Sequence, residues 1–165
     1  MKTTTDRITF THVYFWGGEF SNFYLVKIKY NGINFYSTEQ IFMWEKALYF
    51  NDKETAAKIM VESEPSTCKA LGRQVKNFDA NKWSEVSYDI MVNANYEKYT
   101  QSLMLKDILL ATKNRVLVEA SPYDKIWGVG LHQDDDRILD EKNWKGQNLL
   151  GKALMEVRDK IKNEL

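Results

Sequence analysis

The sequence contains little cysteine, histidine or proline. Its 165 residues include one cysteine, two histidines and two prolines. The lone cysteine, Cys68, cannot close an internal disulfide, which is compatible with a reducing compartment. His12 and His132 stand far apart and no CxxC pair accompanies them, so the ligand spacing of a zinc site is missing. We therefore expect no metal site and no cofactor.

The chain also lacks net charge and long apolar runs. Lys plus Arg and Asp plus Glu number 23 each. No overall field would hold the chain on a long polyanion, so any contact with nucleic acid must be local. The start, MKTTTDRITF, lacks the apolar stretch of a signal peptide, and no window approaches the roughly 18 apolar residues of a membrane span. We expect a cytoplasmic protein without membrane association, and its oligomeric state stays open.

Repeats, low-complexity tracts and linkers rich in Pro, Gly or Ser are absent as well. A chain of this length can bury one core of ordinary size. We predict a single domain over residues 1–165.

Apolar periodicity predicts a mainly α domain with a small β portion, an α+β fold. Alternating residues favour strands over 9–16, 24–30 and 33–36, and Asn31-Gly32 is typical of a type I′ hairpin turn. From Ser37 onward the spacing becomes helical. The expected helices are 38–48, one capped by Asn51 or Asp52 and running to Met60, one beginning at Pro65, then 83–99, 102–111 and 149–161, with a further strand over 115–120.

The segment STEQIFMWEKA, residues 37–47, places two charges among large apolar side chains. On a helix Glu39 and Lys46 lie in line, about 20° apart and two turns distant. Phe42 and Met43 flank that line, and apolar neighbours can desolvate an amine and tune it for chemistry. The alternative is a solvated face on which Glu39 favours the helix dipole. The arc expected to face the core holds Ile41, Trp44, Ala47 and Leu48.

A second acidic region is LVEASPYD, residues 117–124, followed by a Trp-Gly-Val-Gly segment. If 116–120 is a strand, Glu119 shares a face with Leu117, where a carboxylate needs a partner or a ligand. It is equally compatible with a strand end in solvent. Ser121-Pro122 suits a helix cap and first helical residue, which would expose Asp124 on a short turn. Gly128 allows a ligand to approach the backbone closely, although this glycine pattern is a weak phosphate signal.

Aromatic residues are abundant, at 13% of the chain. Phe20, Phe23, Trp83 and Trp127 could stack on a flat heterocycle, a contact worth about 1–3 kcal/mol per base. Core packing is the alternative for each of them.

Taken in order, several motifs resemble the NADAR family, also called YbiA-like. The resemblance covers residues 14–160. Its motifs are FSNFY at 20–24, YSTEQ at 36–40 with Lys46, ALGR at 70–73, Trp83, LVEASPYD at 117–124, IWGVG at 126–130, GQNLLG at 146–151 and LMEVR at 154–158.

The resemblance implies a compact, mainly helical fold and an N-glycosidase, a hydrolase that cleaves the bond between a ribose carbon and nitrogen. Glu39, Lys46 and Asp124 match acidic and lysine positions of the family motifs, and we expect them to be the catalytic residues. A desolvated lysine can form a Schiff base with the C1 aldehyde of an opened sugar, so we expect Lys46 to be the amine nucleophile. The residues implied to bind the substrate are Phe20, Ser21, Asn22, Phe23, Trp83, Glu119, Trp127, Gly128 and Asn148. Lys69, Arg73 or Arg158 could contact phosphates.

The substrate that we expect is ADP-ribose on a modified guanine in DNA or RNA. The alternatives are a phosphoribosyl intermediate of riboflavin synthesis, a ribosylamino-pyrimidine phosphate, and a non-catalytic ADP-ribose or nucleotide sensor. Gln40 stands where the family pattern usually has His, and glutamine cannot titrate near neutral pH. Gln40 is the feature that favours the sensor.

Overall fold

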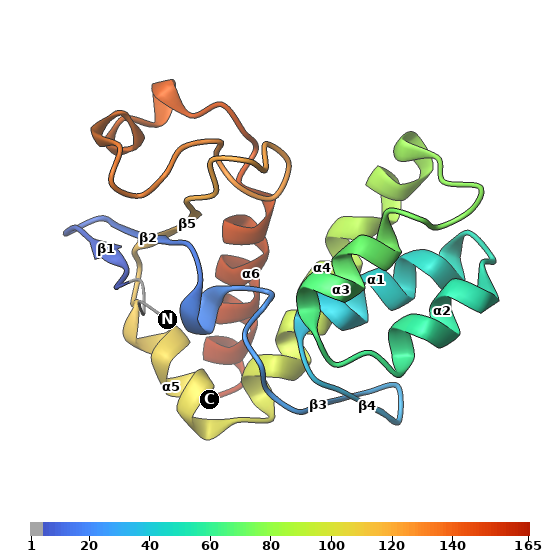
Figure 1. The fold of residues 1–165 in the computed structure, drawn as a ribbon. Helices are drawn as coiled ribbons and strands as arrows, with labels where there is room; N and C mark the ends of the chain where they lie inside the picture. The colour runs from blue at the N-terminus through green and yellow to red at the C-terminus, as the bar shows by residue number, and fades with distance from the viewer. Residues whose placement is uncertain (1–4) are drawn as a thin grey trace. The chain divides into compact units, whose positions relative to one another are not determined.

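The computed structural model describes residues 5–165, which divide into two compact units (Figure 1). The central unit is Asn22–Gln101. The terminal unit joins residues 5–21 to Ser102–Leu165. Six α-helices and five short strands in the described part of the chain confirm the predicted mainly α fold with a small β portion.

The central unit begins with the predicted hairpin. Strands β3 (Ile28–Tyr30) and β4 (Ile33–Phe35) pair antiparallel. Asn31 and Gly32 have φ values of 51° and 77°, the positive values that a type I′ turn requires at both positions. The strands are shorter than expected.

Four helices follow, and the start signals of the first three are those seen in the sequence. The fourth begins at Ala80 rather than at the expected Trp83, because the Asp79 carboxylate caps it. The Ser37 hydroxyl caps α1 by accepting from the Gln40 N–H, and Asp52 rather than Asn51 caps α2. A proline opens α3, where its missing N–H costs nothing. The helices are α1 (Thr38–Tyr49), α2 (Lys53–Met60), α3 (Pro65–Gly72) and α4 (Ala80–Thr100).

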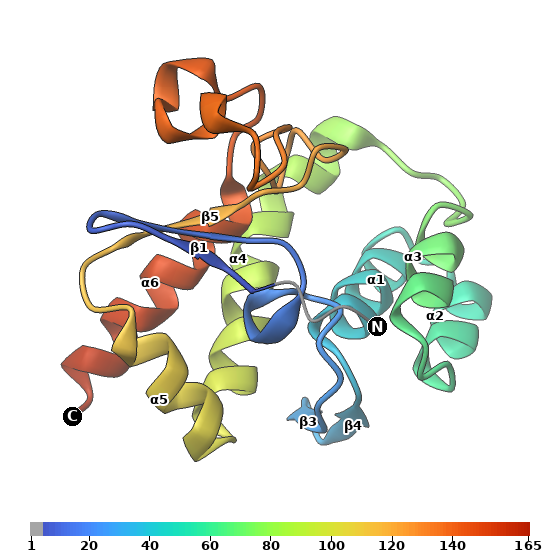
Figure 2. The ribbon, with the colours of Figure 1, turned by 60° about the vertical axis from the view of Figure 1, so that its left-hand side comes forward.

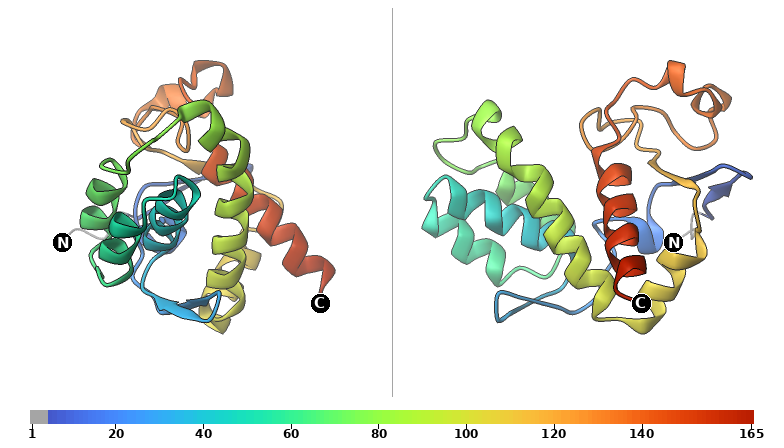
Figure 3. Two further views of the ribbon diagram at one scale, coloured as in Figure 1. Left: turned by 90° about the vertical axis from the view of Figure 1, so that its right-hand side faces the viewer. Right: turned by 180° about the vertical axis from the view of Figure 1, so that it is seen from behind.

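Helix α1 packs against α2, α3 and α4 (Figure 3). The approach of α3 is close, because a Cβ on Gly72 would overlap the Met43 sulfur. Ile41 and Ala47 are buried as predicted, but Leu48 is 41% exposed, so the predicted arc is wrong at that residue. With helices on several sides, α1 buries its first turn and its Phe42 instead.

The terminal unit contains a three-stranded sheet in the order β1-β2-β5. Strand β2 (His12–Phe15) pairs antiparallel with β1 (Arg7–Ile8) and parallel with β5 (Val116–Glu119). Helix α6 (Leu149–Asn163) packs on β5 (Figure 2), and α5 (Leu103–Ala111) contacts α6.

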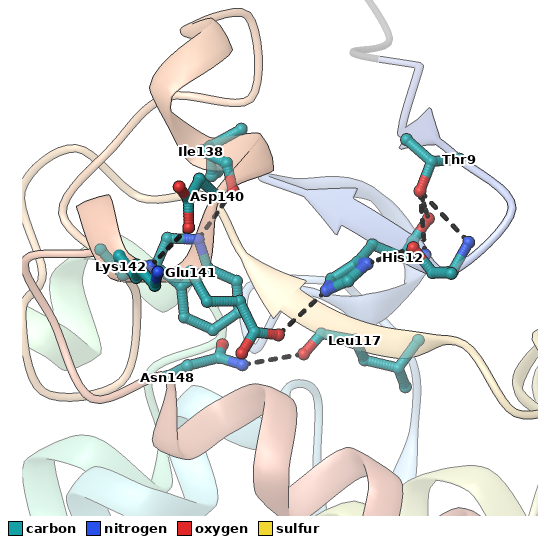
Figure 4. A network of polar contacts seen from close by, with 10 residues as sticks. Thr9, His12, Leu117, Ile138, Asp140, Glu141, Lys142 and Asn148 are labelled. Carbon is teal, nitrogen blue, oxygen red and sulfur yellow. Dashed lines mark hydrogen bonds and ion pairs between the residues drawn. The ribbon is translucent and has the colours of Figure 1, made fainter.

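A long segment between β5 and α6 carries two short 3₁₀ helices, Asp136–Leu139 and Glu141–Asn143. The Trp144 indole N–H donates to the Ile138 carbonyl at 2.8 Å, and His12 Nε2 lies 3.0 Å from Glu141 Oε1 (Figure 4). The first bond lies within the segment, and the second holds the segment against β2. None of the helices within residues 5–165 has the length and apolar character to cross a bilayer.

Acid should weaken the cap of α2. The Asp52 carboxylate accepts from the N–H groups of Lys76 and Thr55 and from the Thr55 hydroxyl, and these bonds lower its pKa from 3.8 to about 2. The folded state therefore favours the charged form, and the stability that this gives is present above pH 3.8 and lost as the pH falls toward 2.

We expect Asp52→Asn to lower the free energy of unfolding above pH 4 and to flatten its decline in acid, measured by denaturant unfolding between roughly pH 2 and 6. Asp135, whose pKa is also about 2, remains in this variant, so the decline shrinks without vanishing. An unchanged decline would show that the cap is not its source.

Candidate functional site

The central unit holds the predicted pair Glu39 and Lys46 on α1. Glu39 is only 7% exposed, which rules out the solvated face for this residue. Its backbone N–H donates to the Asn22 carbonyl at 3.0 Å, so the segment before β3 is tied to the start of α1. Lys46, in the last turn of α1, is half-buried.

The Lys46 amine lies in apolar surroundings. Its Nζ is 4.4 Å from the centroid of the Phe78 ring. Burial lowers the pKa of Lys46 from the usual lysine value; the Glu39 carboxylate opposes this change and the Arg73 guanidinium adds to it. A lowered pKa increases the fraction of neutral, nucleophilic amine near pH 7.

Asn22 and Phe23 offer contacts for a ligand in the same unit. Asn22 is buried, and its side-chain N–H₂ donates to the Met91 sulfur at 3.4 Å. Its Oδ1 meets no donor among residues 5–165, so it could accept from a ligand hydroxyl. The Phe23 ring is partly exposed and lies 5.8 Å from Lys69 Nζ.

Two of the four aromatic candidates pack in cores. Trp83 is 8% exposed, and its ring lies 5.1 Å from that of Phe42 and near those of Tyr49 and Phe50. Phe20, in the terminal unit, is buried 5.5 Å from Phe15. Both rings are buried against other aromatic rings, which favours the core-packing alternative.

Asp124, in the terminal unit, organises a turn after β5. The Ser121 hydroxyl accepts from the Asp124 N–H, as a cap would, but no helix follows. Asp124 Oδ1 instead accepts from the N–H groups of Ile126 and Trp127 at 2.9 and 2.8 Å. This leaves Oδ2 directed to no donor of the described chain. Trp127 is half-buried.

Asn148 acts as a bridge to β5. Its Oδ1 accepts from the Glu119 N–H at 3.0 Å. Its Nδ2 donates to the Leu117 carbonyl at 2.9 Å (Figure 4). The residue is buried and has a φ of 54°, and it precedes α6. Both ends of the Asn148 amide are therefore bonded to strand β5. One of these bonds holds the backbone of Glu119, and the sequence predicts both Asn148 and Glu119 as substrate-binding residues.

Gly128 packs closely against the backbone of Asp124 and Glu119. A Cβ at this position would lie 2.9 Å from the Asp124 carbonyl oxygen and 3.1 Å from that of Glu119. The glycine thus permits the turn to fold against the end of β5.

Ser21 lies just beyond a short 3₁₀ helix, Gly18–Phe20, and its N–H donates to the Gly18 carbonyl.

Gln40 is fully engaged in the central unit. It is 1% exposed, its Oε1 accepts from the Tyr36 N–H at 2.7 Å, and its Nε2 donates to the carbonyls of Ile59 and Met60. These bonds join the start of α1 to the end of α2. A residue with this role does not need to titrate.

Sequence reasoning missed Phe78, because nothing in its local pattern connects it with Lys46. It also missed an aromatic group in the terminal unit, in which the Trp16 ring lies 5.8 Å from Tyr123 and 5.4 Å from His132.

Arg158 is buried and donates to the Thr112 hydroxyl and to the Arg115 carbonyl, so its guanidinium is bonded within the protein. Across residues 5–165, no three His, Cys, Asp or Glu side chains are arranged to hold a metal ion.

A model of the NADAR domain matches residues 13–162, which span nearly the whole chain and both units. The chain belongs to the NADAR family. This confirms the resemblance seen in the motifs.

Several known proteins are similar to this chain over most of its length. The chain is 44% identical over 123 residues to N-glycosidase R617 of Acanthamoeba polyphaga mimivirus, covering 74% of this chain and 72% of that protein. It is 32% identical over 144 residues to N-glycosidase YbiA of Escherichia coli, covering 87% and 81%. Protein irg-1 of Caenorhabditis elegans is 42% identical over 131 residues, which are 78% of this chain but only 62% of the worm protein.

The NMR structure of E. coli YbiA has the same fold. It matches with a TM-score of 0.78 at 28% identity, covering 99% of this chain and 92% of that one. N-glycosidases are hydrolases, so the comparisons support the predicted class of enzyme.

Replacement of Gln40 should affect stability more than chemistry. Gln40→Leu leaves the buried Ile59 carbonyl and the partly buried Tyr36 N–H without these bonds, which should cost about 1–3 kcal/mol of unfolding free energy. Neutral histidine keeps one donor and one acceptor, so Gln40→His should lose less. Denaturant unfolding measures both. A large gain in turnover by Gln40→His, with a pKa near that of imidazole, would instead place this position in the chemistry.

The Asn148 bridge can be tested apart from its backbone conformation. Asn148→Gly tolerates the positive φ but removes both side-chain bonds, whereas Asn148→Asp keeps the acceptor for Glu119 and places a carboxylate against the Leu117 carbonyl. We expect both variants to unfold at lower temperature by thermal denaturation. A glycine variant as stable as the wild type would show that the bridge contributes nothing.

Proposed function

We propose that this protein is an N-glycosidase that releases ADP-ribose from modified guanine in nucleic acid. The observation that carries the proposal is the half-buried amine of Lys46 on the same helix face as the buried carboxylate of Glu39, in a member of the NADAR family. Asp124, the third proposed catalytic residue, retains an oxygen that its own turn does not use.

The reaction requires cleavage of the bond between C1 of ribose and nitrogen. The electron pair of that bond moves to the nitrogen, which takes up a proton, while positive charge develops at C1 and the ring oxygen. A carboxylate stabilises that charge, and a carboxylic acid can supply the proton. Water adds to C1 and loses a proton, so one water is consumed in each turnover. Glu39 and Asp124 are proposed for these proton and charge-stabilising roles.

The lysine provides a covalent route to the same products. In the ring-opened substrate C1 is bonded to the leaving nitrogen as an iminium ion. The neutral Lys46 amine attacks C1, the leaving group departs with a proton, and a Schiff base joins C1 to Nζ. Water then hydrolyses this Schiff base and regenerates the amine and the sugar aldehyde. The lowered pKa of Lys46 supports this role, because only the neutral amine can attack.

The proposed binding groups have polar and cationic character that suits a ribosyl phosphate. Asn22 offers a buried acceptor for a hydroxyl, and Phe23 a partly exposed ring. Lys69 and Arg73, one turn apart on and just after α3, are cations available to phosphate. Glu119 and Trp127 are the remaining proposed contacts on the terminal unit. The engagement of Gln40 by backbone groups removes the feature that had favoured a non-catalytic sensor.

Turnover should depend on Lys46 and Glu39. We expect Lys46→Ala to abolish release of ADP-ribose from an ADP-ribosylated guanine oligonucleotide, and Glu39→Gln to reduce it by about 10²–10⁴-fold. Mass spectrometry measures the product, with a ribosylamino-pyrimidine phosphate tested in parallel. Lys58→Ala is the matched control, since Lys58 is a solvent-exposed lysine of the same unit paired with Glu54.

Each variant should unfold within a few degrees of the wild type, which separates lost chemistry from lost structure. Cleavage of the small phosphate without cleavage of the oligonucleotide would assign the protein to the riboflavin-related substrates. Full activity of Lys46→Ala would remove the lysine from the mechanism.

A further inference from the structure

Phe78 is an unusual surface residue. It lies between α3 and α4 and is 48% exposed, yet its ring covers the Lys46 amine at 4.4 Å. The same ring packs against Phe50 at 5.4 Å, and Phe50 belongs to the aromatic group around Trp83. The ring therefore contacts both the amine and a buried aromatic side chain, and part of it is open to solvent.

The segment that carries Phe78 is anchored on both sides. Before it, Val75 is buried and the Lys76 N–H donates to the Asp52 carboxylate at 3.0 Å. Asn77 then turns the chain with a φ of 62°. After it, the Asp79 carboxylate caps α4 by accepting from two backbone N–H groups. The exposed ring is consequently held in place, although the segment has no regular structure.

Two charged residues act on the amine besides this ring. Glu39, on α1, favours the ammonium form, and Arg73, at the end of α3, disfavours it. Their effects on the pKa of Lys46 oppose each other. The largest influence on the amine is its removal from water.

We propose that Phe78 is a positioning residue of the reaction, whose ring shields the Lys46 amine from water and so maintains its neutral, nucleophilic form. The proposal rests on the proposed role of Lys46 as nucleophile. Phe78 itself forms no bond to the substrate and transfers no proton.

The ring has two effects of opposite sign, and two variants separate them. Its π face attracts the ammonium ion and raises the pKa of Lys46, whereas its bulk excludes water and lowers it. Phe78→Leu removes the π face but keeps apolar cover. Phe78→Ala removes both. Shielding predicts a higher pKa of Lys46 in Phe78→Ala and no increase in Phe78→Leu.

The pKa can be measured without any substrate, by NMR titration of protein labelled with ¹³C at the lysine Cε, with Lys46→Arg assigning the signal. Tyr36→Ala is the control, because Tyr36 is a similarly exposed aromatic residue of the same unit that lies before the start of α1, whereas Lys46 lies in its last turn. A pKa in Phe78→Ala equal to or below that of the wild type would overturn the proposal. So would an equal rise in Phe78→Leu.

The pH dependence of turnover then connects the shielding to the reaction. In the wild type the rate should rise with pH as Lys46 loses its proton, and Phe78→Ala should shift this rise to higher pH and lower the rate at pH 7 by roughly three- to tenfold. Thermal unfolding verifies that the variant is folded. If no substrate is cleaved, the proposed function fails, but the NMR titration still decides whether Phe78 shields the amine.

Discussion

The central unit depends on satisfying a buried, polar first turn of α1. Ser37, Glu39 and Gln40 are all removed from water, and unpaired polar groups at such a place are costly. The Ser37 hydroxyl, the Asn22 carbonyl and the Gln40 amide meet this requirement with backbone bonds. They also join three segments distant in sequence. The position of Glu39 is thus a consequence of how the helix is anchored.

Local signals allowed much of this to be predicted from sequence. The Asn31-Gly32 turn, the Ser37 and Asp52 caps and the Pro65 helix start each act within a few residues, so the pattern determines the structure. The parallel pairing of β2 with β5 could not be predicted in this way, because it joins segments separated by about a hundred residues. The approach of Phe78 to Lys46 is of the same long-range kind.

For the site, the sequence identified residue types better than their roles. Helical spacing placed Glu39 and Lys46 on one face, but only the structure shows that Glu39 is buried there and Lys46 half-buried. Trp83 has the chemistry of a stacking platform and lies in a core instead. Asn148 lies in the expected motif, yet its amide is bonded on both sides to β5. Exposure and bonding decide such roles, and neither is encoded in a local pattern.

A nucleophilic lysine needs both partial desolvation and access to the substrate. Lys98 is 1% exposed between the rings of Tyr24 and Tyr99, so it has the first property without the second. Lys58 is solvent-exposed on α2 and paired with Glu54, so it has only the second. Lys46 is half-buried beneath a ring that is itself open to solvent on one side. Lys46 therefore combines a partly shielded amine with partial exposure to solvent.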